Sequence, residues 1–439
     1  MHGRLVKGAA LQTLMSTAVS VCTICTYAII GRWYGSDALG QVAFWTAASR
    51  IYLTALDFGA SPTVRRDLAA AGAIGKRRRY EAAFQMRLLS MASGLFVVGS
   101  FWALTGRPLS ELATCLAVYI YVGTRSLLDL STVVYVARGT FGVPAFIVVA
   151  NEVATFLAVA AAAVYRRELS SGLWMCCLIC TLAGFICLRA TWRQYGYRVR
   201  WRLDWRGIKE VVKRGFATGS YVLCGMVLQK FDSTLLGIVS EKAAVALYNA
   251  ASNIAVGTRL LPAAVGQAAL PAVTRAFTTG DRTGIKIVAE LYCAMVAAGV
   301  VVGAAVFILA RLLVSTVFGA GFEPAASCLG ILAFAIPFSY FNSISWSVCV
   351  ATYRDRVPVY AIVIGTCTSV AANLAMVPAL GQNGAAYASC AAEAVMTVTY
   401  LLLFTRGGWG MFLRGGSGPE AVNGMARVAA AAAAPRMKG

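Results

Sequence analysis

The chain contains 439 residues, of which 59% are hydrophobic and 13% charged, against about 45–50% and about 25% in soluble domains. This composition excludes a soluble globular protein and predicts an integral membrane protein. The net charge of +21 does not indicate a nucleic-acid partner, because a basic excess in a multi-spanning protein normally lies in cytoplasmic loops and contacts anionic phospholipids there.

Twelve apolar segments predict an all-α polytopic membrane protein, because each is about long enough to cross a bilayer as a helix. They occupy residues 8–30, 38–59, 82–104, 112–135, 143–165, 172–188, 215–238, 243–273, 286–310, 324–350, 357–378 and 384–404. No small-residue cleavage site follows the first segment, so we interpret it as a span and not as a signal peptide.

Basic residues outside the spans predict the orientation of the chain. One set of alternate connections contains 28 lysines and arginines, and the other set contains 6. Because basic loops remain on the cytoplasmic side, both termini are expected in the cytoplasm.

The longest polar connection, 189–214, separates two groups of six spans. Its mixture of Trp, Tyr and Arg suits a helix lying along the inner headgroup layer. The first hairpins of the two halves resemble each other, since VKGAALQT recurs as VKRGFATGS and PTVRR as PAVTR. Equivalent segments run in the same direction, which predicts two six-helix bundles, 1–188 and 215–404, related by a pseudo-two-fold axis along the membrane normal. The Gly- and Ala-rich segment 405–439 is expected to be a disordered cytoplasmic tail.

Charged side chains inside the spans are the strongest functional signal. The cations at this depth are Arg50, Arg125, Lys230 and Arg259, and the carboxylates are Asp129, Glu152, Asp232 and Glu393. Each unpaired charge there costs about 2.5–3.5 kcal/mol, so compensation is required. Two interpretations remain open. The charges either form ion pairs that hold helices together, or they form a cationic cavity for an anionic substrate, with the carboxylates as candidate coupling-ion sites.

The spacing of these residues gives more specific expectations. Arg125 and Asp129 stand four apart on one helical face and are placed to pair. Lys230 and Arg259 are expected to face Arg50 and Arg125 across the interface between the bundles. Of the carboxylates, Asp232 is the least certain member of this group.

Prolines inside two spans predict bends. Pro262 and Pro337 each remove a backbone hydrogen bond, and the carbonyl that is freed must find another partner. The glycines of GVVVG, 299–303, are expected to let helices pack closely.

Catalytic and metal chemistry is not expected. The single histidine is His2, so the spans lack the usual general base and the commonest metal ligand. The CxxC spacing of Cys22 and Cys25 lacks further ligands, and we interpret these cysteines as small hydrophobic residues. No enzyme activity, metal or cofactor is therefore predicted.

Four ordered motifs resemble the Wzx-type polysaccharide flippases of the superfamily that also contains multidrug antiporters and lipid II flippases. They are LDFGASPTVRR (56–66), KFDSTLLGIVSEKAAVALYNAASNI (230–254), LPAAVGQAALPAVTR (261–275) and NLAMVPALGQNGAAYAS (373–389), which precedes Glu393. The resemblance implies a bacterial inner-membrane exporter of an undecaprenyl-diphosphate-linked oligosaccharide that works by alternating access with proton or sodium coupling. Other glycan-assembly membrane proteins are then expected partners.

Three alternatives remain open beside this interpretation. A small-molecule or multidrug cation antiporter of the same superfamily favours an acidic, aromatic cavity, whereas the spans here hold as many cations as anions. A membrane-embedded glycan polymerase or ligase needs a long outer loop, which the predicted spans do not leave. A scaffold without transport activity makes no use of buried charge.

Overall fold

The computed structural model describes residues 2–69, 76–105, 109–138, 140, 142–196, 203–279, 282–352, 354 and 356–406. Every secondary-structure element within these ranges is a helix. The elements are α1 (His2–Asp57), α2 (Ala60–Ala69), α3 (Lys76–Thr105), α4 (Leu109–Ala137), α5 (Gly142–Val164), α6 (Leu169–Tyr195), α7 (Trp205–Val239), α8 (Lys242–Thr258), α9 (Leu260–Thr279), α10 (Arg282–Phe318), the 3₁₀ turn η1 (Ala320–Phe322), α11 (Ala325–Ala333), α12 (Ala335–Ala351) and α13 (Arg356–Arg406). The predicted tail, apart from the end of α13, lies outside the described residues.

Two of these helices each contain two of the predicted spans. The chain turns within α1 at Gly35, with φ 87°, and within α13 at Gly381, with φ 54°. Glycine takes up positive φ without the steric cost that a Cβ brings, so it serves at both turns. By length and hydropathy alone, seven described helices qualify as membrane spans, or eight when α11 and α12 are counted as one bent span.

Both predicted proline bends are present. The eighth span breaks between α8 and α9, at Arg259, and the tenth is bent by 47° between α11 and α12. Pro262 frees the carbonyl of Thr258, and the hydroxyl of Tyr340 donates to that carbonyl at 3.0 Å. The broken helix is therefore tied to α12.

The glycine motif packs against the second bend. A Cβ built on Gly299 would lie 2.9 Å from Cα of Pro337, and one on Gly303 would lie 2.9 Å from the carbonyl oxygen of Ala333. This oxygen is the one freed by Pro337, so the glycines of α10 lie close to the break between α11 and α12.

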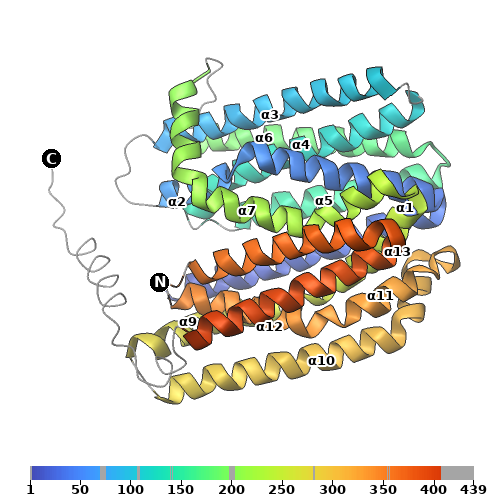
Figure 1. Cartoon of the computed structure of the whole chain (residues 1–439). Helices are drawn as coiled ribbons and strands as arrows, with labels where there is room; N and C mark the ends of the chain where they lie inside the picture. The colour runs from blue at the N-terminus through green and yellow to red at the C-terminus, as the bar shows by residue number, and fades with distance from the viewer. Residues whose placement is uncertain are drawn as a thin grey trace.

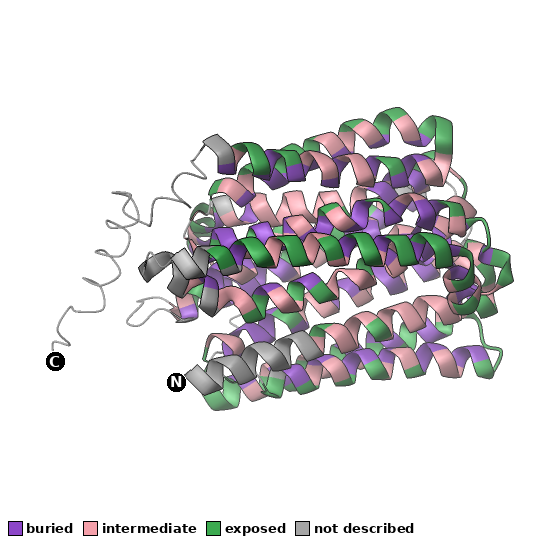
Figure 2. Ribbon diagram, turned by 90° about the horizontal axis from the view of Figure 1, so that it is seen from below, coloured by how far each residue is buried: buried purple, intermediate pink, exposed green. Residues whose placement is uncertain are grey.

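The helices lie side by side in two groups, with α3, α4 and α6 on one side and α10, α11 and α12 on the other (Figure 1). Exposed positions gather on the outward faces of the outer helices (Figure 2). Many are large and apolar, including Phe96 at 77%, Phe146 at 75% and Ile308 at 77% exposure. Such a surface suits contact with lipid chains and not with water.

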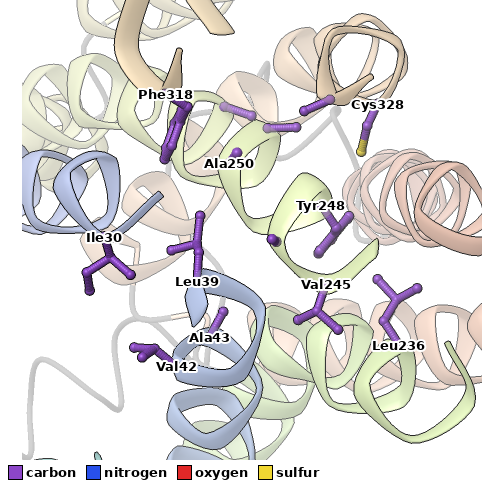
Figure 3. Close-up of a cluster of buried hydrophobic side chains, with 14 of the residues drawn as sticks. Ile30, Leu39, Val42, Ala43, Leu236, Val245, Tyr248, Ala250, Phe318 and Cys328 are labelled. Carbon is purple, nitrogen blue, oxygen red and sulfur yellow. The ribbon is translucent and has the colours of Figure 1, made fainter. Parts of the chain in front are cut away.

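The two groups meet in an apolar core near the Gly35 turn. Figure 3 shows Leu39 of α1, Leu236 of α7, Val245 of α8 and Phe318 of α10 converging there. The approach is closest at Gly40, where a Cβ would lie 1.9 Å from the carbonyl oxygen of Lys242. Only a residue without a side chain fits between these two backbones.

At the opposite end, ion pairs join the first turns of α7 to α2 and α3. The carboxylate of Asp204 accepts a hydrogen bond from Gly207 N at 3.0 Å, which caps α7, and another from Arg78 at 2.7 Å. Arg79 bridges Asp67 at 2.9 Å and Glu210 at 3.1 Å. Much of the predicted connection 189–214 is helical, because α6 continues to Tyr195 and α7 already begins at Trp205.

Candidate functional site

A cavity of about 450 Å³ lies in the N-terminal group of helices. Its wall is formed by α1, α2, α4 and α5. Arg65 of α2 and Arg125 and Asp129 of α4 are its charged lining residues, and Ser16, Ser20 and Thr132 are its hydroxyl-bearing ones. Arg65 lies in a connection between two of the predicted spans, and its position in the chain does not reveal that α2 turns it toward this cavity.

Arg125 is compensated within this bundle. It pairs with Glu152 of α5 and, at 3.4 Å, with Asp129 one turn further along α4. The side chains of Arg125 and Glu152 are 14% and 11% exposed, whereas that of Asp129 is 55% exposed. The pair predicted from the four-residue spacing is present, and a second carboxylate from another helix completes it.

A second cavity, of about 250 Å³, lies in the C-terminal group between α7, α9, α12 and α13. Arg259, at the break between α8 and α9, pairs with Glu393 at 2.8 Å on its wall. The side-chain amide of Asn342 donates to the other oxygen of Glu393 at 2.8 Å and accepts from Thr397 at 3.0 Å. Arg259 remains 39% exposed at its side chain, so part of its guanidinium faces the cavity.

Asp232 occupies a separate, closed site. It is 2% exposed and accepts hydrogen bonds from Tyr248, from Ser389 at 2.8 Å and from Asn373 at 2.7 Å. These donors are neutral, so the site holds a carboxylate without a cationic partner among its hydrogen-bonding neighbours. A buried charge held in this way depends on its full set of donors.

Arg50 and Lys230 differ from the other two cations. They come from α1 and α7, and the positive charge of Arg50 acts on Lys230. Arg50 is exposed and Lys230 half-buried. Within the described part of the chain, neither side chain has a carboxylate within salt-bridge distance, although the charge of Arg50 also acts on Glu152. Arg50 and Lys230 are thus two like charges, one from each group of helices, that act on each other, and the charge of Asp232 also acts on Lys230.

A sequence model of the family described as lipid II flippase MurJ matches residues 87–427, which is more than half of the chain. The chain belongs to the lipid II flippase MurJ family. It is therefore a flippase-type transporter of the superfamily that the sequence motifs indicated, although the Wzx branch predicted from them is not the one whose model matches. No curated protein sequence matches the chain.

Solved structures share the fold at low sequence identity. A lipid II flippase MurJ in an inward closed conformation superposes with a TM-score of 0.72 at 12% identity, covering 97% of this chain and 94% of that one. A mutant of the Vibrio cholerae MATE transporter VcmN gives 0.64 at 12%, covering 92% and 96%. A MOP superfamily transporter from Pyrococcus furiosus, described by the reverse polarity of its binding pocket, gives 0.63 at 12%, covering 92% and 95%.

These likenesses confirm the predicted fold class of about twelve transmembrane helices in two six-helix bundles. MurJ flippases and MATE transporters are transporters, which agrees with the predicted transport function.

Among the predicted site residues of this MurJ family member, the four cations do not form one cluster. Arg125 and Arg259 are each paired within their own bundle, and only Arg50 and Lys230 come together between the bundles. The expectation that all four face one another across the interface is therefore not met for the two paired arginines. Glu152 comes from the next helix along the chain from Arg125, whereas Glu393 comes from α13, which the sequence does not place beside Arg259.

Proposed function

We propose that this chain moves a lipid-diphosphate-linked glycan from the inner to the outer leaflet by alternating access. The family's name supplies lipid II as the type of substrate, and the sequence motifs suggest an undecaprenyl-diphosphate-linked oligosaccharide. Both are chemically alike in having a polyprenyl tail, a diphosphate and sugar. The proposal keeps to this shared chemistry.

The observation that supports it is the unpaired cation pair, Arg50 and Lys230. Two positive charges held near each other repel, and at bilayer depth each also loses hydration. An anion placed between them removes both costs. A diphosphate suits the site because its two negative charges match two cations, with paired donors from the guanidinium and a point charge from the ammonium.

The membrane potential acts in the direction of the proposed transport. Moving negative charge outward from a negative interior releases about 2.3 kcal/mol per charge per 100 mV. The carboxylates Asp129, Glu152, Asp232 and Glu393 remain candidates for ion coupling. Asp232 is the best placed of them, because it is the one without a cationic partner among its hydrogen-bonding neighbours.

We further propose that both termini and the end of the protein that contains the Arg78–Asp204 ion pair are cytoplasmic. The support is the distribution of lysine and arginine, since 28 lie in the set of alternate connections on this side and 6 in the other set. Anionic phospholipids then contact this face, and other glycan-assembly membrane proteins deliver or receive the substrate. A multidrug cation antiporter is disfavoured because Arg50 and Lys230, which have no salt-bridge partner among the described residues, repel cationic drugs. Among the described residues, no feature comparable to this cation pair favours a glycan polymerase or ligase.

The test is flipping of a fluorescent undecaprenyl-diphosphate-linked sugar in proteoliposomes. Arg50→Gln and Lys230→Gln each remove one cation without removing an ion-pair partner, so both variants are expected to fold and to flip at least about tenfold more slowly. Arg311→Gln is the matched control, because Arg311 lies on the exposed surface in a pair with Glu323. Wild-type flipping by the Arg50→Gln/Lys230→Gln double variant would refute the proposal.

A further inference from the structure

The cavity of the C-terminal bundle has a lining that a diphosphate site does not need. It contains three aromatic side chains with polar edges, Tyr221 of α7, Trp346 of α12 and Tyr400 of α13. Trp346 and Tyr221 interact with each other on this wall. Trp346 is 43% exposed, so part of its ring is accessible to a ligand.

The rest of the lining supplies neutral hydrogen-bonding groups in unusual number. On α12 the spacing Ser339, Asn342, Ser343, Trp346 and Ser347 brings these residues to one side of the helix. Gln229 of α7 and Gln267 of α9 add amides from the facing helices. Hydroxyls and amides both donate and accept, so this wall is complementary to a ligand that also does both.

The one charged pair on the wall also offers both hydrogen-bond donors and acceptors. Arg259 and Glu393 neutralise each other at 2.8 Å, which leaves the cavity without the net positive charge that would select phosphate. Arg259 presents N–H donors, and the carboxylate beside it presents acceptor oxygens. Neighbouring donors and acceptors of this kind bind vicinal hydroxyl groups through two hydrogen bonds at once.

The size and the position of the cavity complete the argument. Its volume of about 250 Å³ lies just below the roughly 300–1,000 Å³ that is usual for ligand pockets, so it accommodates one ring and not an oligosaccharide. Gln229 lines it and is followed directly in α7 by Lys230. Consecutive residues of a helix point about 100° apart, which places the cavity beside the cation pair and not within it.

We propose that this cavity is a sugar subsite, which binds the pyranose ring attached to the diphosphate while Arg50 and Lys230 bind the diphosphate itself. The inference rests on the proposed flippase function and deepens it. The C–H face of the ring packs on the negative face of the Trp346 indole. The ring hydroxyls bond to Gln229 and to the Arg259–Glu393 pair, which Asn342 holds in place. Recognition then depends on a sugar being present, and not only on a lipid diphosphate.

The test compares the binding of two probes to the full chain in nanodiscs. One probe is undecaprenyl diphosphate, and the other is undecaprenyl diphosphate that bears a single N-acetylhexosamine. Wild-type protein is expected to bind the sugar-bearing probe at least about tenfold more tightly. Trp346→Ala should reduce this preference to within about twofold and leave the affinity for the bare diphosphate unchanged. Lys230→Ala should weaken both probes by similar factors.

Two further variants keep the test interpretable. Trp174→Ala is the matched control, because Trp174 is 41% exposed on α6 of the other bundle and should leave both affinities unchanged. Gln229→Ala truncates an exposed lining residue without opening the core, and it should lower the preference severalfold even if Trp346→Ala does not fold.

The sugar subsite is overturned if wild-type protein shows no preference for the sugar-bearing probe. It is equally overturned if folded Trp346→Ala and Gln229→Ala retain that preference or weaken both probes alike. Failure of the underlying function looks different. In that case wild-type protein binds neither probe, or Lys230→Ala changes the affinity for neither.

Discussion

Arg125 offers the sharpest test of how this protein tolerates charge at bilayer depth. Arg125→Ala leaves Glu152 buried without its partner, and both side chains are less than 15% exposed. Breaking a buried pair in this way costs about 3–5 kcal/mol. The charge of Arg50 still acts on Glu152, so we expect a loss of unfolding free energy near the lower value, about 3 kcal/mol.

Two companion variants separate the contributions to that loss. Asp129→Asn removes a contact at 3.4 Å, but the carboxylate is 55% exposed, so solvent screening limits its effect to under about 1 kcal/mol. The double variant Arg125→Met/Glu152→Met removes both charges at similar volume, and it should recover stability to within about 1 kcal/mol of wild type.

The measurement is SDS-induced unfolding in mixed micelles, followed by intrinsic fluorescence, with flipping assayed separately on the folded variants. The expected order of stability is wild type, Asp129→Asn and the double methionine variant close together, with Arg125→Ala well below. If the double variant is as unstable as Arg125→Ala, the cost does not arise from an unpaired Glu152, and our account of this pair is wrong.

Three further predictions address other parts of the structure. Tyr340→Phe leaves the freed backbone carbonyl of Thr258 without its donor, and it should lower the unfolding free energy by about 1–3 kcal/mol in the same assay. In a Pro262→Ala background, which restores the backbone N–H, this loss should largely vanish. An undiminished loss would contradict the role of Tyr340. The hydrogen bond and charge of Arg78 hold the pKa of Asp204 below its ordinary value, so the stability from this pair is present above about pH 4 and is lost as the pH falls below it. The unfolding midpoint of Asp204→Asn should accordingly depend less on pH below about pH 4 than that of wild type, and parallel pH profiles would exclude this linkage. Asp232→Asn is nearly isosteric and should fold, while ion-dependent flipping falls at least about tenfold; unchanged flipping would remove Asp232 from the coupling mechanism.

The sequence predicted the helical elements well because their signals are local. Twelve apolar segments, two interior prolines and a four-residue spacing between Arg125 and Asp129 all act within one or two turns of helix. The positions of the bends followed from the missing N–H of Pro262 and Pro337. Gly35 and Gly381 have non-helical φ/ψ angles, so each breaks the helix between two of the predicted spans.

The pairing of charges on different helices was not predicted, because it depends on which helices are neighbours. Glu393 lies far along the chain from Arg259, and nothing local shows that α13 passes the break after α8. The polar face of α12 is different. Ser339, Asn342 and Trp346 recur at helical spacing, and this pattern was available in the sequence but hidden within a span that reads as apolar overall.

The contact between Gly40 and Lys242 has a mechanical consequence. Because two backbones touch directly at Gly40, no side chain at this point can change its rotamer to keep the contact as the helices move apart. A separation wide enough for one water molecule breaks the whole contact at once. Even the single methyl group of an alanine at position 40 would therefore push the two backbones apart and disfavour the conformation in which they touch.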